Sequence, residues 1–176
     1  MEKNGIIEKW FPTIVTSGSR ASAPHAYTSS RRRIGYGEPV VVDIGPLWMG
    51  YDGCVAYTFI VGRNKFWEEV VNIVKQAISE GSRRAKPGIS VRILDEVPRR
   101  IIREYKLPDY PHLTGHPIGG FYKPVIASFI DYVLEENMAF AYEPAVYIQG
   151  RGGVRIEHHV IVTSNGYKIL TACSSF

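Results

Sequence analysis

The chain has 176 residues, 45% hydrophobic and 22% charged, which predicts one globular domain over residues 1–176. No apolar run approaches the roughly 20 residues that span a bilayer, and the first ten residues lack a secretion signal, so we expect a cytoplasmic protein without membrane contact. The net charge of +4 is only mildly basic. Arginine clusters at 29–33, 82–86 and 97–103 are expected to be solvated surface, because no aromatic residues interleave with them. Binding of nucleic acid or an acidic peptide is the alternative.

The first half of the chain predicts strands followed by a helix. Residues 13–17, 39–45 and 54–62 carry the Val, Ile, Tyr and Thr enrichment of strands. Residues 63–81 place apolar side chains at helical spacing, and Gly81 follows as an expected C-terminal stop.

A second helical pattern begins at Ser90, a good N-cap, and continues to Tyr105. It contains Pro98, which should kink the helix or divide it into two pieces. Residues 129–137 are expected to form a short third helix or a helical turn.

Strand-like composition returns at 138–148, 152–163 and 167–173. Asn165 and Gly166 tolerate the positive φ angles of a tight hairpin turn, so the last two strands are expected to be antiparallel neighbours. Strands, then helices, then strands again predict the α+β class.

Asp43 is an unexpected residue, because it ends a run of β-branched residues where a buried strand would carry another apolar side chain. A bend in the chain, a buried salt bridge and a metal ion would each explain it. His116, Glu143 and Glu157 also have apolar neighbours that predict burial. Several buried carboxylates repel one another unless a cation neutralises them. Oxygen ligands with one imidazole suit manganese, iron, cobalt or zinc in a hydrolytic site.

Four segments, 13–27, 40–62, 112–120 and 143–171, resemble in order and spacing the peptidase superfamily of methionine aminopeptidase, aminopeptidase P, prolidase and creatinase. The Xaa-Pro peptidases are the most similar branch. The resemblance implies the pita-bread fold, a curved, mostly antiparallel sheet flanked by helices. In that family two Asp, one His and two Glu hold two divalent metals. By position these would include Asp43, His116, Glu143 and Glu157, and His25 would match a histidine that meets substrate.

The chain departs from this family pattern at the second metal-binding Asp, the residue that bridges the two metals. That position, eleven residues after the first Asp, is Cys54 here. A small apolar filler is the favoured interpretation of Cys54, a thiolate ligand is the alternative, and Asp52 could reach the site only by a register change. Cys54 and Cys173 are too few for a disulfide scaffold and are expected to be free.

Two further departures concern substrate and assembly. The family's second substrate histidine, in a His-Glu pair, falls on Lys123-Pro124. The family also carries N-terminal helices that this chain is expected to lack, which predicts a homo-oligomer or a separate N-terminal subunit covering the exposed surface.

Two functions follow from this resemblance. The first is a metal-dependent hydrolase of short proline-containing peptides with one divalent ion and weak or no activity. In it Glu143 or Glu157 takes a proton from water, and His25 or Lys123 steadies the oxyanion. The second is a non-catalytic module on the same fold, without a metal, that binds protein or nucleic acid.

Overall fold

The structure is a computed structural model that describes residues 8–171. Its helices are α1 (Lys65–Ser82) and α2 (Val91–Glu104), with a 3₁₀ turn, η2, at Gly18–Ser22. Its strands are β1 (Glu8–Lys9), β2 (Ile14–Ser17), β3 (Pro39–Ile44), β4 (Pro46–Trp48), β5 (Tyr51–Asp52), β6 (Val55–Ile60), β7 (Gly115–Pro117), β8 (Ala139–Tyr142), β9 (Ala145–Ile148), β10 (Gly152–Arg155), β11 (His158–Thr163) and β12 (Gly166–Ile169). Cys173 lies outside the described residues.

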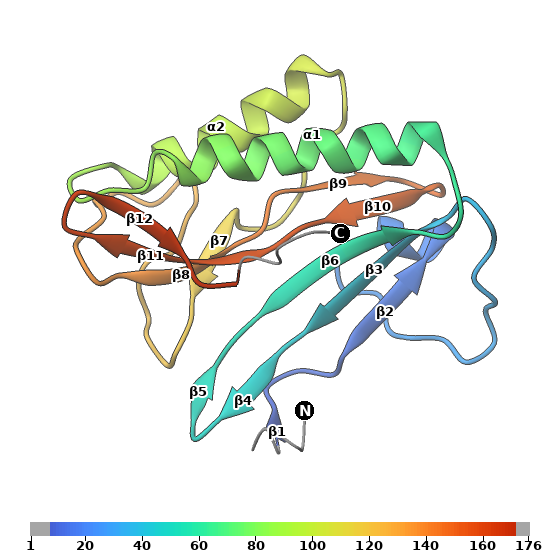
Figure 1. Cartoon of the computed structure of the whole chain (residues 1–176), viewed down its shortest axis with the longest axis horizontal. Coiled ribbons are helices and arrows are strands. Elements are labelled where there is room, and N and C mark those ends of the chain that lie inside the picture. Colours follow the sequence, from blue (N-terminus) through green and yellow to red (C-terminus); the bar gives the residue numbers. More distant parts are fainter. Residues whose placement is uncertain (1–7, 172–176) are drawn as a thin grey trace.

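The strands pair antiparallel in the orders β2-β3-β6, β12-β11-β8-β7, β10-β9 and β1-β4-β5. Figure 1 shows the helices on one side of these strands, with α1 running over β9 and β10 and α2 beside α1. The predicted α+β class with mostly antiparallel pairing is confirmed. No helix among residues 8–171 combines the length and apolar character needed to cross a membrane.

The main hydrophobic core lies between the two helices and the strands beneath them. The α1 side chains Trp67, Val70, Val74 and Ile78 pack with Leu94 and Ile102 of α2 and with buried side chains of β8 to β11. Because one face of each helix is apolar, burial of that face explains why both helices lie flat on the strands.

Helix α1 confirms the prediction for residues 63–81, but Gly81 has a different role from the expected stop. Asn64 caps the helix by accepting a hydrogen bond from the backbone N–H of Trp67. The helix continues through Gly81 to Ser82. A Cβ at position 81 would clash with the hydroxyl of Tyr142, so this glycine provides space for a buried tyrosine.

Helix α2 begins after Ser90 as predicted, but Pro98 does not divide it. Proline has no N–H, so the carbonyl of Leu94, four residues earlier, loses its helical donor. The hydroxyl of Tyr142 donates to that carbonyl instead. A side chain from β8 therefore satisfies the group that Pro98 leaves unpaired.

The third helix expected at 129–137 is absent from the structure. The middle of this segment is extended between turns at 128–129 and 136–137, and it lies beside the residues that lead into α2, where Val91 N donates to Tyr132 O and Leu134 N donates to Ile89 O. Pairing with those residues satisfies the backbone that a helical turn would have satisfied internally.

The hairpin of β11 and β12 is antiparallel, as predicted, but its turn differs from the expected one. Thr163 pairs with Gly166, so the two turn residues are Ser164 and Asn165. Neither Asn165 nor Gly166 adopts a left-handed φ. The prediction of positive φ angles at these two residues was wrong.

Candidate metal centre

The strand register brings three of the predicted site residues to one place. Asp43 on β3 pairs with Ala56 of β6, and Cys54 lies just before β6. The backbone N–H of Glu157 donates to the carbonyl of Ala56 at 2.9 Å. Asp43, Cys54 and Glu157 therefore converge, although more than 100 residues separate the first from the last in sequence.

The neighbouring strands bring the other two residues to the same place. His116 on β7 pairs with Ala141 of β8, and Glu143 directly follows that strand. Tyr142 of β8 pairs with His158, the residue after Glu157. His116 and Glu143 thus also lie close to Glu157.

The glutamates lie at interruptions of the strands, which corrects one expectation. Strand-like composition over residues 138–148 and 152–163 predicted a strand through each glutamate. The first divides into β8 and β9 around Glu143, and the second into β10 and β11 around Glu157. Asp43 lies in the sheet formed by β2, β3 and β6, and both glutamates lie outside the ladders.

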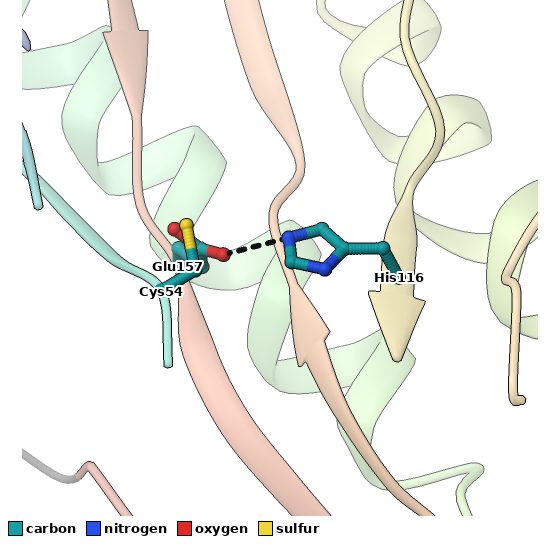
Figure 2. A group of neighbouring side chains, drawn as sticks. All are labelled: Cys54, His116 and Glu157. Carbon is teal, nitrogen blue, oxygen red and sulfur yellow. Dashed lines mark ion pairs between the residues drawn. The ribbon is translucent and has the colours of Figure 1, made fainter. Parts of the chain in front are cut away.

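Cys54, His116 and Glu157 form the tightest group of potential metal ligands (Figure 2). One donor atom from each lies within 4.8 Å of the others. His116 Nε2 lies 3.5 Å from Glu157 Oε1 and 3.9 Å from Glu143 Oε1. Figure 2 shows Cys54 and Glu157 together, facing the imidazole of His116.

Asp43 forms a buried ion pair with Arg155, whose side chain is 0% exposed. Arg155 NH1 also donates to the carbonyl of Pro24 at 2.7 Å and to the hydroxyl of Tyr147 at 2.9 Å. The other Asp43 oxygen, Oδ1, lies 3.6 Å from the sulfur of Cys54. Of the three explanations for Asp43, the buried salt bridge is present in the structure.

Burial and mutual repulsion perturb the titrating groups of this cluster. Burial raises the pKa of Glu143, and the carboxylate of Glu157 raises it further. Burial lowers the pKa of His116, but the two glutamates outweigh this and raise it to about 9. Burial and the surrounding carboxylates also raise the pKa of the Cys54 thiol. The cluster therefore favours bound protons or another cation over free negative charge.

Glu157 provides the strongest evidence that a cation fits here. Its side chain is 0% exposed, and within residues 8–171 neither carboxylate oxygen accepts a hydrogen bond. The compensation that Glu157 has is the ion pair with His116, whose Nε2 lies 3.5 Å from Oε1. A buried carboxylate that is paired but accepts no hydrogen bond still carries much of its desolvation cost. Imidazole, carboxylate and thiol donors suit a divalent transition metal.

Most of the cluster borders a cavity of about 1210 Å³, although Glu157 itself does not line it. Asp43, Cys54, His116 and Glu143 line it, and His25 contributes to its wall. Aromatic side chains, among them Trp10, Phe11, Tyr27 and Phe129, form much of the remaining wall. This volume exceeds the roughly 300–1,000 Å³ of typical small-molecule sites.

Two predicted residues lie away from this cavity. Lys123 is exposed, and its ammonium lies 5.0 Å from the centre of the Tyr132 ring. Asp52 accepts a hydrogen bond from the backbone N–H of Gly120 at 2.6 Å. The structure brings neither residue into the cluster, and neither lines the cavity.

Three residues at the site were missed from the sequence. Arg155 lies two residues before Glu157, a spacing that could have indicated a shared strand face. His112 lines the cavity and is held by Leu113 O at 2.8 Å and the Tyr147 hydroxyl at 3.0 Å. His159 accepts a hydrogen bond from Cys54 N at 2.9 Å. Only the fold reveals the contact between residues 54 and 159.

Comparisons with solved structures define the class of this fold. The prolidase from Pyrococcus furiosus superposes with a TM-score of 0.92 at 37% identity, over 99% of this chain and 52% of that chain. The X-Pro aminopeptidase from Thermotoga maritima MSB8 gives 0.92 at 33% identity, over 98% of this chain and 50% of that one. The fold is the pita-bread fold, as the resemblance implied.

Sequence comparisons define the family. The model of metallopeptidase family M24 matches residues 1–164, and the chain belongs to this family. An Xaa-Pro dipeptidase of Pyrococcus furiosus is 39% identical over 175 residues, covering 97% of this chain and 50% of that protein. An uncharacterized peptidase of Staphylococcus epidermidis is 36% identical over 176 residues, with the same coverage. The chain spans about half the length of these relatives.

Proposed function

We propose that this chain forms the catalytic site of a peptidase that hydrolyses short Xaa-Pro peptides with one divalent ion, and that its activity is weak. The single observation that carries the proposal is the convergence of His116, Glu143 and Glu157 beside a large cavity that His116 and Glu143 line. The substrate class comes from relatives named Xaa-Pro dipeptidase.

His116 and Glu157 would hold the ion, with Glu143 beside them. The Nδ1 atom of His116 lies 2.9 Å from the carbonyl of Pro117, so a proton on Nδ1 leaves the Nε2 lone pair toward Glu157. When bound, the ion would act as a Lewis acid for the scissile carbonyl and for water.

The remaining chemistry belongs to side chains of the cavity. Glu143 is placed to accept a proton from water and to pass it to the leaving amine, because it lies beside His116 and lines the cavity. His25, on the cavity wall, is placed to donate a hydrogen bond to the developing oxyanion. The aromatic wall offers an apolar surface to a proline ring.

Two features support weak activity. The bridging carboxylate of the family pattern is replaced by Cys54, and Arg155 already neutralises Asp43. A second divalent ion would lack one carboxylate and compete with a guanidinium for another. We therefore expect one ion per chain and slow hydrolysis.

The test measures hydrolysis of Xaa-Pro dipeptides beside the Pyrococcus furiosus enzyme. Weak wild-type turnover should be abolished by His116→Ala and fall about 10²-fold or more in Glu143→Gln, which removes the proton acceptor but keeps the shape. Cys54→Asp should raise turnover on the order of 10²-fold by restoring the bridging carboxylate. Turnover that survives His116→Ala, or no turnover in either wild type or Cys54→Asp, contradicts the proposal. The assay includes a measurement of oligomeric state, because we also expect a second copy or another subunit beside this chain.

The arginine clusters give little support to the alternative of a nucleic-acid module. Four of the eight arginines in these clusters are neutralised within the chain by the ion pairs Arg32–Glu38, Arg83–Glu80, Arg99–Asp95, Arg99–Asp109 and Arg103–Glu96. Arginines already paired in this way offer less positive charge to phosphates.

A further inference from the structure

We propose that Cys54 is a metal ligand, and that with His116 and Glu157 it forms a sulfur, nitrogen and oxygen site that selects zinc or cobalt over manganese or magnesium. The inference rests on the proposed function in one respect, that this cluster holds a metal. It adds the sulfur ligand and the class of metal. Soft thiolate ligands favour zinc and related ions, whereas carboxylate and water suit manganese and magnesium.

The geometry places the sulfur among the other donors. The donor atoms of Cys54, His116 and Glu157 lie within 4.8 Å of one another. Bonds of about 2.0–2.3 Å in a tetrahedral zinc site separate donors by roughly 3.3–3.8 Å. Binding therefore requires a contraction of at most roughly 1–1.5 Å, and His116 Nε2 and Glu157 Oε1, at 3.5 Å, already have this separation.

A second observation at the same place also indicates a cation. Both oxygens of Glu157 are buried, and within the described chain neither accepts a hydrogen bond. One of them lies in the same group as the Cys54 sulfur and a His116 ring nitrogen, and Oε1 lies 3.5 Å from His116 Nε2. An ion held by all three would compensate the Glu157 carboxylate.

The backbone around Cys54 holds the sulfur in this position. Cys54 N donates to His159 Nε2 at 2.9 Å, which ties the residue before β6 to β11. A Cβ on Gly53 would lie 3.2 Å from His159 Cε1, so glycine at 53 allows the close approach of the imidazole. His159 is a positioning residue for Cys54.

The surroundings of Cys54 argue against a simple apolar filler. One side of its side chain packs against Ile118 and Ala141. The sulfur faces Asp43 Oδ1 at 3.6 Å, and it shares the ligand group with His116 and Glu157. On metal binding the S–H bond breaks, a sulfur–metal bond forms, and the thiol proton is released to solvent.

The experiment loads the purified chain with Co²⁺ and records the near-ultraviolet charge-transfer absorption of a cobalt–thiolate bond. We expect one ion per chain by elemental analysis, with the band present in wild type and absent in Cys54→Ser. Cys173→Ser is the matched control, because it removes the other cysteine, and it should keep the band. Zinc affinity, measured by competition with a chromophoric chelator, should fall on the order of 100-fold in Cys54→Ser, since loss of an outer-shell partner alone costs 10–100-fold. Zinc should also displace manganese from wild type far more readily than from Cys54→Asp.

A measurement without any substitution guards against a variant that fails to fold. The X-ray absorption spectrum of zinc-loaded wild type should contain one sulfur neighbour at about 2.3 Å. One bound ion without a sulfur signal overturns this inference and leaves the proposed peptidase standing. A sulfur signal without hydrolysis supports this inference and counts against the peptidase. A band that survives Cys54→Ser, a band lost in Cys173→Ser, or no binding of zinc or cobalt overturns the inference.

Discussion

The replacement Arg155→Met should have a large effect on stability. The Arg155 side chain is fully buried, pairs with Asp43, and donates to Pro24 O and the Tyr147 hydroxyl. Methionine keeps much of the volume but removes the charge and the donors. Asp43 is then left as a buried carboxylate without its counter-charge, and two further acceptors lose a hydrogen bond.

Removing one partner of a buried ion pair typically costs about 3–5 kcal/mol, so we expect a loss of about that size in the free energy of unfolding. Arg83→Met is the control, because Arg83 and Glu80 form an exposed i,i+3 pair, and its loss should be at most about 0.5 kcal/mol. The assay is urea unfolding of metal-free protein at neutral pH, followed by circular dichroism.

A double variant tests the cause of the loss. If the cost comes from the unpaired carboxylate, Asp43→Asn in the Arg155→Met background should recover part of the stability, because an amide is far less costly to bury than a charge. A loss below about 1 kcal/mol in Arg155→Met, or no recovery in the double variant, would refute the reasoning.

Two further predictions concern stability away from the site. Arg32 lowers the pKa of Glu38 to about 2. In urea unfolding, wild type should therefore have a higher free energy of unfolding than Glu38→Gln, with the full difference above about pH 4.5 and its loss as pH falls toward 2. An unchanged difference at pH 2 would be inconsistent with this pair. A Cβ at Gly153 would clash with the carbonyl of Ala21, so Gly153→Ala should lower the free energy of unfolding by about 1–3 kcal/mol. Gly166→Ala, with free space around it, should lower it clearly less. Equal losses in thermal unfolding would contradict this.

Local patterns were sufficient to predict the elements whose stability is local. Helix α1 has a continuous apolar face and an Asn64 cap, and both can be read within about 20 residues. The Ser90 cap of α2 is similarly visible, as are most strands. Segment 129–137 was misassigned because the loop at 88–91, with which it pairs, lies about 40 residues away in the sequence.

The role of Tyr142 explains two errors at once. Its hydroxyl occupies the space beside Gly81 and donates to the Leu94 carbonyl that Pro98 leaves unpaired. From sequence alone, Gly81 indicated a stop and Pro98 a break. A long-range contact of one side chain changes both outcomes, and no local pattern contains that contact.

The candidate site was only partly predictable for the same reason. Buried polar residues in apolar segments were sufficient to identify Asp43, His116, Glu143 and Glu157 as unusual. The pairing of Asp43 with Arg155 depends on how β3 and β10 lie in the fold. Which residues hold a metal remains a prediction that the experiments above test.

The buried charges explain why a single ion suits this arrangement. In the proposed liganded state Asp43, the Cys54 thiolate and Glu157 are anionic, while Arg155 supplies one positive charge. One divalent ion then brings these four groups to neutrality, whereas a second would leave an excess of positive charge among them in a poorly solvated place. Arg155 therefore makes a second ion unnecessary for neutralising these groups, and Glu143 is left as the proposed proton acceptor beside the cavity.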